Sequence, residues 1–84
     1  MRMTRTELIG LFERTATEIA ERDIKGLSEL TEISTLGIDS LGILELVGEM
    51  EKQLNIQLPD DQLVGLTKIG DLLDLVEKRR QLAS

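Results

Sequence analysis

The sequence predicts an all-α fold: a small four-helix bundle with a long loop between helices one and two and a short third helix. The chain has 84 residues, which limits it to one domain with one core. Its apolar residues recur mostly at spacings of three and four, and no alternating run of strand length stands out. We expect a single domain over residues 1–84, with helices at roughly 5–22, 39–54, 60–65 and 67–82.

The first helix is expected to begin just after Thr4. Thr4 and Glu7 have the spacing of a capping box, in which each side chain accepts a hydrogen bond from the other residue's backbone N–H. One face of the following segment gathers Leu8, Phe12, Thr15, Ala16 and Ile19. This pattern predicts a helix with one face on the core, fading near residues 22–26.

The segment from residue 24 to residue 38 is too long for a simple connection in a compact domain. An apolar residue recurs at every third position, at Leu27, Leu30, Ile33 and Leu36. We interpret the segment as an ordered loop with a helical turn that pins these side chains onto the core. Gly37 is the expected site of a sharp bend.

The second helix is expected to begin at Asp39 or Ser40. On a helical wheel its core face holds Ile43, Leu46, Val47, Met50 and Leu54, and its polar face holds Gly42, Glu45, Glu49 and Lys52. A third set, Leu41, Leu44 and Gly48, lies away from the core beside Ser40. This stripe is either covered by the loop or the third helix, or it is a contact surface for partners or cargo.

The remaining helices are predicted from their caps. Asp60 or Asp61 can cap a short third helix, and Thr67 can cap the fourth. The buried face of the fourth helix is expected to hold Ile69, Leu72, Leu73 and Val76, with cations at its C-terminal end. The acidic residues Asp60, Asp61, Asp71 and Asp74 are interpreted as caps and solvated positions, and no metal site is expected.

Composition excludes several classes of function. The chain has no Cys and no His, so it lacks a thiol nucleophile, the commonest general base and the commonest transition-metal ligand. We therefore expect no catalytic residues. A net charge of −6 and a single aromatic residue argue against nucleic-acid binding and favour basic protein partners.

Targeting signals are also absent from the pattern. No apolar run reaches 18 residues, so no membrane span is expected. The first residues contain no apolar stretch long enough for a secretory signal. We expect a cytoplasmic monomer.

Ser40 can be interpreted in two ways. A Ser at the start of an apolar helix is an ordinary N-terminal signature. A self-activated Ser nucleophile is disfavoured because no His can serve as its base. If Ser40 has a chemical role, another protein acts on it, and a phosphodiester there would suit the N–H groups and dipole of a helix N-terminus.

The segment Leu36-Gly37-Ile38-Asp39-Ser40-Leu41 resembles the prosthetic-group site of acyl carrier proteins. The family's signature is an Asp-Ser-Leu triplet that opens the second helix, usually after a Gly two residues before the Asp. The resemblance continues through residues 54–61, with Pro59-Asp60-Asp61, and into residues 67–72. It covers about 36–76, whereas the first helix matches only in length and amphipathicity.

The resemblance implies an acyl-carrier-like fold and a non-catalytic carrier. A phosphopantetheinyl transferase would move 4′-phosphopantetheine from coenzyme A onto Ser40, with Asp39 and Leu41 as part of the same site. Acyl groups would be held as thioesters on this arm for partner enzymes of fatty acid, polyketide or related lipid biosynthesis. The imported thiol agrees with the absence of Cys from the chain.

The partner surface is expected at Leu44, Glu45, Gly48 and Glu49, facing acyl-transferring and synthase enzymes with basic docking surfaces. Gly42 and Gly48 depart from the family pattern, and this favours a specialised polyketide, lipid or aminoacyl carrier over a housekeeping fatty-acid carrier. The alternatives are a peptidyl or aminoacyl carrier, and an unmodified helical adaptor whose stripe binds one partner stably.

Overall fold

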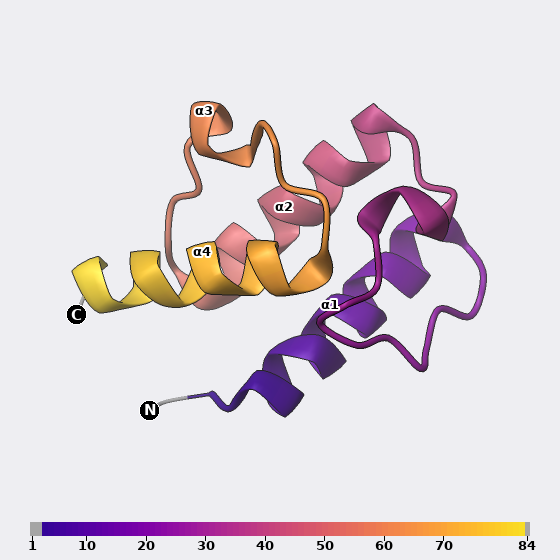
Figure 1. Ribbon diagram of the computed structural model, residues 1–84, viewed down its shortest axis with the longest axis horizontal. Helices are drawn as coiled ribbons and strands as arrows, with labels where there is room; N and C mark the ends of the chain where they lie inside the picture. The colour runs from indigo at the N-terminus through magenta and orange to yellow at the C-terminus, as the bar shows by residue number, and fades with distance from the viewer. Residues whose placement is uncertain (1–2, 84) are drawn as a thin grey trace.

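The computed structural model describes residues 3–83, which form four α-helices and one 3₁₀ turn. In chain order these elements are α1 (Arg5–Ala20), η1 (Ile33–Leu36), α2 (Ser40–Leu54), α3 (Asp60–Leu63) and α4 (Ile69–Ala83). The long connection between α1 and α2 wraps one end of the bundle, and the short α3 stands above α2 and α4 (Figure 1). The predicted fold class is confirmed.

The capping box predicted at the start of α1 is present. The Thr4 hydroxyl accepts from the Glu7 amide at 3.1 Å, and the Glu7 carboxylate accepts from the Thr4 amide at 2.8 Å. The hydrogen bond from the Thr4 amide, followed by one from the Thr4 side chain, holds the pKa of the Glu7 carboxyl below its ordinary value. The helix ends at Ala20, two residues before the predicted end, because Glu21 takes a left-handed conformation and its amide donates to the Thr17 carbonyl.

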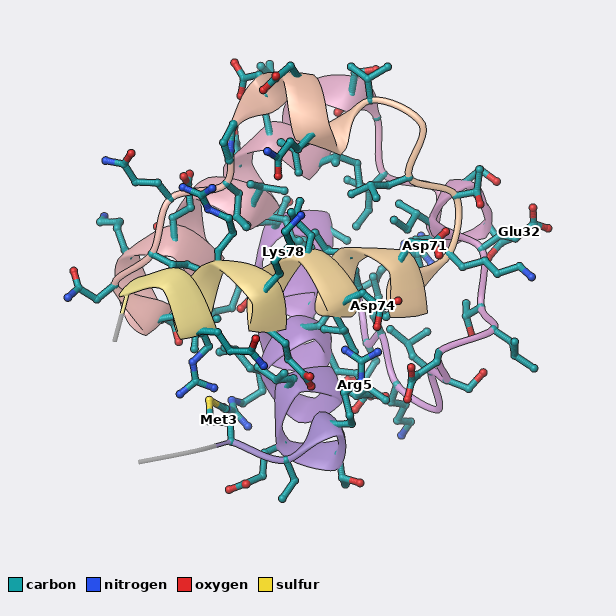
Figure 2. The ribbon with its side chains drawn as sticks, turned by 60° about the vertical axis from the view of Figure 1, so that its left-hand side comes forward. Met3, Arg5, Glu32, Asp71, Asp74 and Lys78 are labelled. Atoms are coloured by element: carbon teal, nitrogen blue, oxygen red, sulfur yellow. The ribbon has the colours of Figure 1, made fainter. Side chains whose placement is uncertain are left out.

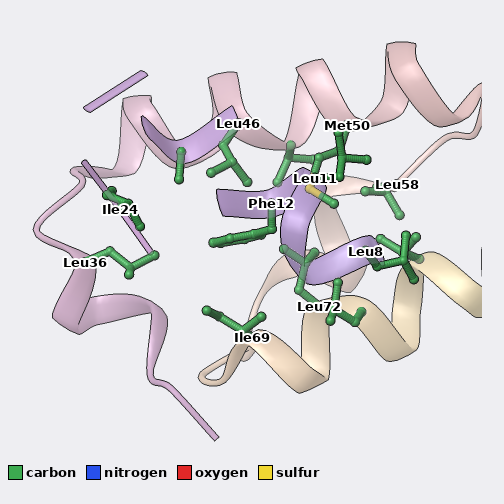
Figure 3. Packing of buried hydrophobic residues seen from close by; sticks show 14 of the residues in the cluster. Leu8, Leu11, Phe12, Ile24, Leu36, Leu46, Met50, Leu58, Ile69 and Leu72 are labelled. Atoms are coloured by element: carbon green, nitrogen blue, oxygen red, sulfur yellow. The ribbon is translucent and has the colours of Figure 1, made fainter. Parts of the chain in front are cut away.

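One core joins all the long elements. Phe12 of α1 lies at its centre, among side chains from α2, α4 and the long loop (Figure 3). Burying each large apolar side chain contributes about 1.5–3 kcal/mol to folding. Thr15 is buried as predicted, and its hydroxyl donates to the Leu11 carbonyl at 2.8 Å. The buried apolar residues are Leu8, Leu11, Phe12, Ala16, Ile24, Leu36, Leu46, Val47, Met50, Ile56, Leu58, Ile69, Leu72, Leu73 and Val76.

The long loop is ordered because its backbone pairs with the segment before α4. The Ile33 amide donates to the Thr67 carbonyl and the Ile69 amide to the Thr31 carbonyl, both at 2.9 Å. A further bond joins the Gly70 amide to the Glu29 carbonyl. We call this set the backbone clasp. The predicted bend at Gly37 is present, with φ of +70°.

Leu30 does not pack on the core, contrary to the prediction. Its side chain is 76% exposed. The residue lies in a tight turn, closed by the Thr31 amide on the Ser28 carbonyl at 3.1 Å. This turn interrupts the pattern in which every third residue faces the core. Of the four predicted residues, Leu36 is buried, and Leu27 and Ile33 pack partly against the core.

Arg5 at the start of α1 binds three carboxylates. Its guanidinium lies 2.9 Å from Glu29 and 3.4 Å from Glu77, and it also pairs with Asp74. Figure 2 shows Arg5 reaching toward Asp74 on α4. Desolvation lowers the pKa of Arg5, but the hydrogen bond to Asp74 and the neighbouring charges outweigh it, so the pKa is raised. The cluster fastens the loop and α4 to α1.

Four predicted features of the last two helices are wrong in detail. The N-cap of α3 is Pro59, and neither Asp60 nor Asp61 caps it: both lie in its first turn. The helix ends at Leu63 because Val64 is extended. Helix α4 begins two residues later than predicted, and the Asp71 carboxylate, not Thr67, serves as acceptor there.

Asp71 reaches back over the start of α4. Its carboxylate accepts from the backbone amides of Lys68 at 3.1 Å and Thr67 at 3.4 Å. The Thr67 hydroxyl donates to the same oxygen at 3.2 Å. The backbone hydrogen bond from Lys68, followed by that from Thr67, holds the pKa of Asp71 below its ordinary value.

Candidate functional site

Ser40 is the first residue of α2, and its side chain is exposed. The preceding Asp39 supplies the cap: its carboxylate accepts from the Gly42 amide at 2.8 Å. Within residues 3–83 the Ser40 hydroxyl makes no hydrogen bond, so it is free to react. Of the two interpretations of Ser40, the structure therefore gives the capping role to Asp39.

Gly42 was predicted on the polar face of α2 but is buried. A Cβ at this position would lie 2.5 Å from Ile38 Cγ2 and 3.2 Å from the Asp39 carboxylate. The loop residue Ile38 folds back over the first turn of the helix, and only a glycine leaves room for it. The residue that approaches Gly42 closely is thus Ile38 of this same chain.

A hollow of about 640 Å³ opens beside Ser40, which we call the Ser40 hollow. Ile43, Val47 and Leu72 are among the apolar side chains that line it from α2 and α4. Leu63 and Leu66 close it on the side of α3, with Val64, 82% exposed, at the same side. Sequence periodicity identified the α2 side but gave no signal that the segment around α3 would face it.

The stripe beside Ser40 is not covered by the loop or by α3. Leu41 is 67% exposed and Leu44 is 53% exposed, and Leu44 also borders the Ser40 hollow. Gly48 is half-buried, and a Cβ there would meet no atom within 4 Å. A side chain at position 48 would therefore point into open space beside α2.

A shallow groove between α1 and α2 carries the acidic residues near this stripe. Glu45 and Glu49 of α2 and Glu18 of α1 line it, around Ile19 and Gly48. Glu49 lies 3.7 Å from Lys52, whereas Glu45 has no cation within ion-pair distance in the described part of the chain. We call it the α1–α2 groove.

The structure does not assemble a catalytic constellation at these positions. Among residues 3–83, no group of three or more acidic side chains is arranged to hold a metal ion. The helices of this same region are also too short or too polar to cross a bilayer. What remains is an exposed hydroxyl at a helix N-terminus, flanked by an apolar hollow and an acidic groove.

Comparison with known proteins shows to which family this chain belongs. A family model described as a phosphopantetheine attachment site matches residues 8–76. The acyl carrier protein of Helicobacter pylori is 30% identical over 76 residues, which cover 86% of this chain and 97% of that protein. An acyl carrier protein homolog of Mycoplasmopsis pulmonis is 29% identical over 63 residues, 75% of this chain and 86% of that protein.

Solved structures agree on the fold. The crystal structure of an acyl carrier protein from Thermotoga maritima superposes with a TM-score of 0.89 at 28% identity, over 99% of this chain and 98% of that one. The solution structure of the acetyl actinorhodin acyl carrier protein of Streptomyces coelicolor gives 0.73 at 24% identity, over 98% and 95%, and supports the fold alone. The chain belongs to the family of phosphopantetheine-bearing acyl carrier proteins, which are carriers and not enzymes.

Proposed function

We propose that Ser40 is the residue that carries the 4′-phosphopantetheine arm. The observation that supports this most directly is its exposed hydroxyl, which has no hydrogen-bond partner in the described chain and stands at the N-terminus of α2 within the family match. When bound, the arm supplies a thiol that holds an acyl group as a thioester. The chain has no Cys that could do this itself.

The surroundings of Ser40 fit such a group. The backbone amides of Ser40 and Leu41 are the first two of α2 and have no intrahelical acceptor. Together with the helix dipole they favour a negative phosphodiester at this end. The Ser40 hollow offers apolar surface beside the attachment point, in keeping with the largely apolar body of an acyl cargo.

The modification requires a partner enzyme. The Ser40 hydroxyl oxygen forms a bond to the pantetheine-bearing phosphorus of coenzyme A, and the bond from that phosphorus to the adenosine-bearing phosphate breaks. The adenosine bisphosphate leaves with the electron pair. The hydroxyl proton passes to a base of the phosphopantetheinyl transferase, because this chain has no His.

We propose that partner enzymes dock on the exposed part of α2. Asp39 and Leu41 flank Ser40, while Leu44 and Gly48 continue the surface along the helix. Its carboxylates at Glu45 and Glu49 complement acyl-transferring and synthase enzymes with basic docking surfaces. Such contacts act mainly on encounter rate, which suits a cytoplasmic, monomeric carrier that must leave each partner.

The cargo we propose is an acyl intermediate of fatty acid, polyketide or related lipid biosynthesis. A peptidyl or aminoacyl carrier is the alternative within the same chemistry. Loading assays that compare acyl and aminoacyl donors on the modified chain would separate the two.

Intact mass tests the attachment site. The chain is incubated with coenzyme A, Mg²⁺ and a broad-specificity phosphopantetheinyl transferase, beside Ser40→Ala and Ser34→Ala. Ser34 is a matched control because it is exposed and lines the same hollow. The wild type and Ser34→Ala should each gain one phosphopantetheinyl group, and Ser40→Ala none. A gain that survives Ser40→Ala would move the site elsewhere, and no gain in any variant would favour the unmodified adaptor.

A further inference from the structure

Arg22 places a guanidinium close to the entry into α2. It follows Glu21, the C-cap of α1, and its side chain lies against Gly37. A Cβ at Gly37 would stand only 2.8 Å from Arg22 Nη2. The guanidinium of Arg22 therefore lies against the bare backbone of Gly37.

A second hollow, of about 360 Å³, contains this cation. Arg22 and Gly37 line it together with Asp39 and Leu41, the two neighbours of Ser40, and with the acidic Glu45 of α2. We call it the Arg22 hollow. Gly37 and Ser40 are three residues apart, so their Cα atoms are separated by at most about 11 Å. The side chain of Arg22 is exposed and can adjust its rotamer over this range.

Arg22 has no ionic partner of its own among residues 3–83. No carboxylate lies within 4.0 Å of it, although Arg5, Lys25 and Lys52 are all paired. Asp39, which lines the same hollow, directs its carboxylate to the Gly42 amide instead. In a chain with a net charge of −6, an unpaired guanidinium at this place is available for an incoming anion.

A phosphodiester on Ser40 would bring such an anion to the same end of α2. The N–H groups of the first turn point out of the helix end, toward the backbone that precedes it. Gly37 belongs to that preceding backbone, and the guanidinium rests on it. The planar fork of an arginine matches two phosphate oxygens at once, which an ammonium does not.

We propose that Arg22 is a positioning residue that pairs with the phosphodiester of the arm. It holds the base of the arm over the N-terminal end of α2 and offsets the charge that modification adds beside Asp39. This inference rests on the proposed attachment at Ser40 and assigns a role to a residue outside the Asp-Ser-Leu segment.

The test compares the wild type with Arg22→Gln, Arg22→Lys and Lys25→Gln. Lys25→Gln removes the same charge nearby but outside the Arg22 hollow, where Lys25 pairs with Asp23 at 3.5 Å. Each variant is converted with coenzyme A and the transferase, and conversion is checked by mass. The readouts are the Arg22 Nε–Hε resonance before and after conversion and the phosphorus-31 resonance of the attached phosphodiester.

The Arg22 resonance should shift on conversion of the wild type. The phosphorus resonance should move in Arg22→Gln, move less in Arg22→Lys and stay unchanged in Lys25→Gln. Both effects should shrink at about 1 M salt, where the screening length falls to about 3 Å. If mass increases but neither resonance responds, the pairing is overturned while the attachment at Ser40 stands. Slower conversion of Arg22→Gln with unchanged resonances would assign Arg22 to the transferase instead, and no mass gain would overturn both proposals.

Discussion

The amide of Gly70 donates a hydrogen bond to the carbonyl oxygen of Glu29 at 2.9 Å. A Cβ on Gly70 would stand 2.9 Å from that same oxygen and 3.0 Å from Glu29 Cβ. The glycine in the first turn of α4 is therefore needed for the loop to approach the helix. The Glu29 side chain is held at the same place by Arg5.

Gly70→Ala should destabilise the fold. The added methyl meets backbone that cannot move without breaking the backbone clasp, and such overpacking costs about 1–3 kcal/mol. This outweighs the roughly 1 kcal/mol by which Ala exceeds Gly in helix propensity. Urea unfolding followed by circular dichroism measures the difference.

The matched control is Gly48→Ala, also inside a helix but with open space at its Cβ position. It should stabilise the chain by about 0.5–1 kcal/mol. Equal effects of the two substitutions would contradict the role given to Gly70.

Substitutions at Asp39 and Ser40 should affect the stability of the fold differently. Asp39→Ala removes the side-chain cap of α2 and should cost about 0.5–2 kcal/mol. Ser40→Ala removes no hydrogen bond present in residues 3–83 and should leave the melting temperature nearly unchanged. Thermal unfolding of the two unmodified variants checks this, and a Ser40→Ala loss as large as that of Asp39→Ala would show that Ser40 also stabilises the start of α2.

Acid should weaken the start of α4 through Asp71. Its pKa is lower in the folded chain than its ordinary value of 3.8, so its stabilising contribution is complete above that value. The contribution is lost as the pH falls through the lower folded pKa. The difference in unfolding free energy between wild type and Asp71→Asn should therefore shrink as the pH is lowered below about 4.

Unfolding curves at several pH values measure this difference. Asp61→Asn is the control, because Asp61 is exposed in α3 and makes no side-chain hydrogen bond in the described chain. A difference for Asp71→Asn that does not vary with pH would argue against the hydrogen bonds from Lys68 and Thr67.

Charge reversal on α2 should slow partner reactions without unfolding the chain. Glu45 is exposed and has no ion-pair partner in the part that the structure describes, so Glu45→Lys breaks no ion pair there. The initial rate of modification by the transferase should fall about tenfold at low salt and recover partly at high salt. Asp23→Lys, on the loop after α1, gives the same change of net charge and should have a much smaller effect. Equal rates for all three proteins would contradict docking at Glu45.

Local patterns in the sequence were sufficient for features that depend on near neighbours. The capping box of Thr4 and Glu7 and the bend at Gly37 were both predicted and are present. In each case the interacting groups lie within one or two helical turns. The motif around Ser40 also depends on consecutive residues, so its resemblance to the family could be seen directly.

Features set by distant segments were not predictable in this way. Gly42 appeared polar on a helical wheel because the wheel omits Ile38, which folds back from the loop. Gly70 gave no signal because its partner, Glu29, belongs to another segment of the chain. The contact of Arg22 with Gly37 gave no signal for the same reason, since the two residues belong to different segments of the chain.

The backbone clasp also determines how the long loop behaves when the protein fluctuates. Its three hydrogen bonds tie residues 29–33 to residues 67–70 near the base of α4, so the loop cannot detach without disturbing that helix. The amide protons of Ile33 and Gly70 should therefore exchange with deuterated solvent as slowly as those of the core helices, through global opening. A segment with little regular secondary structure thus unfolds together with the helices that surround it.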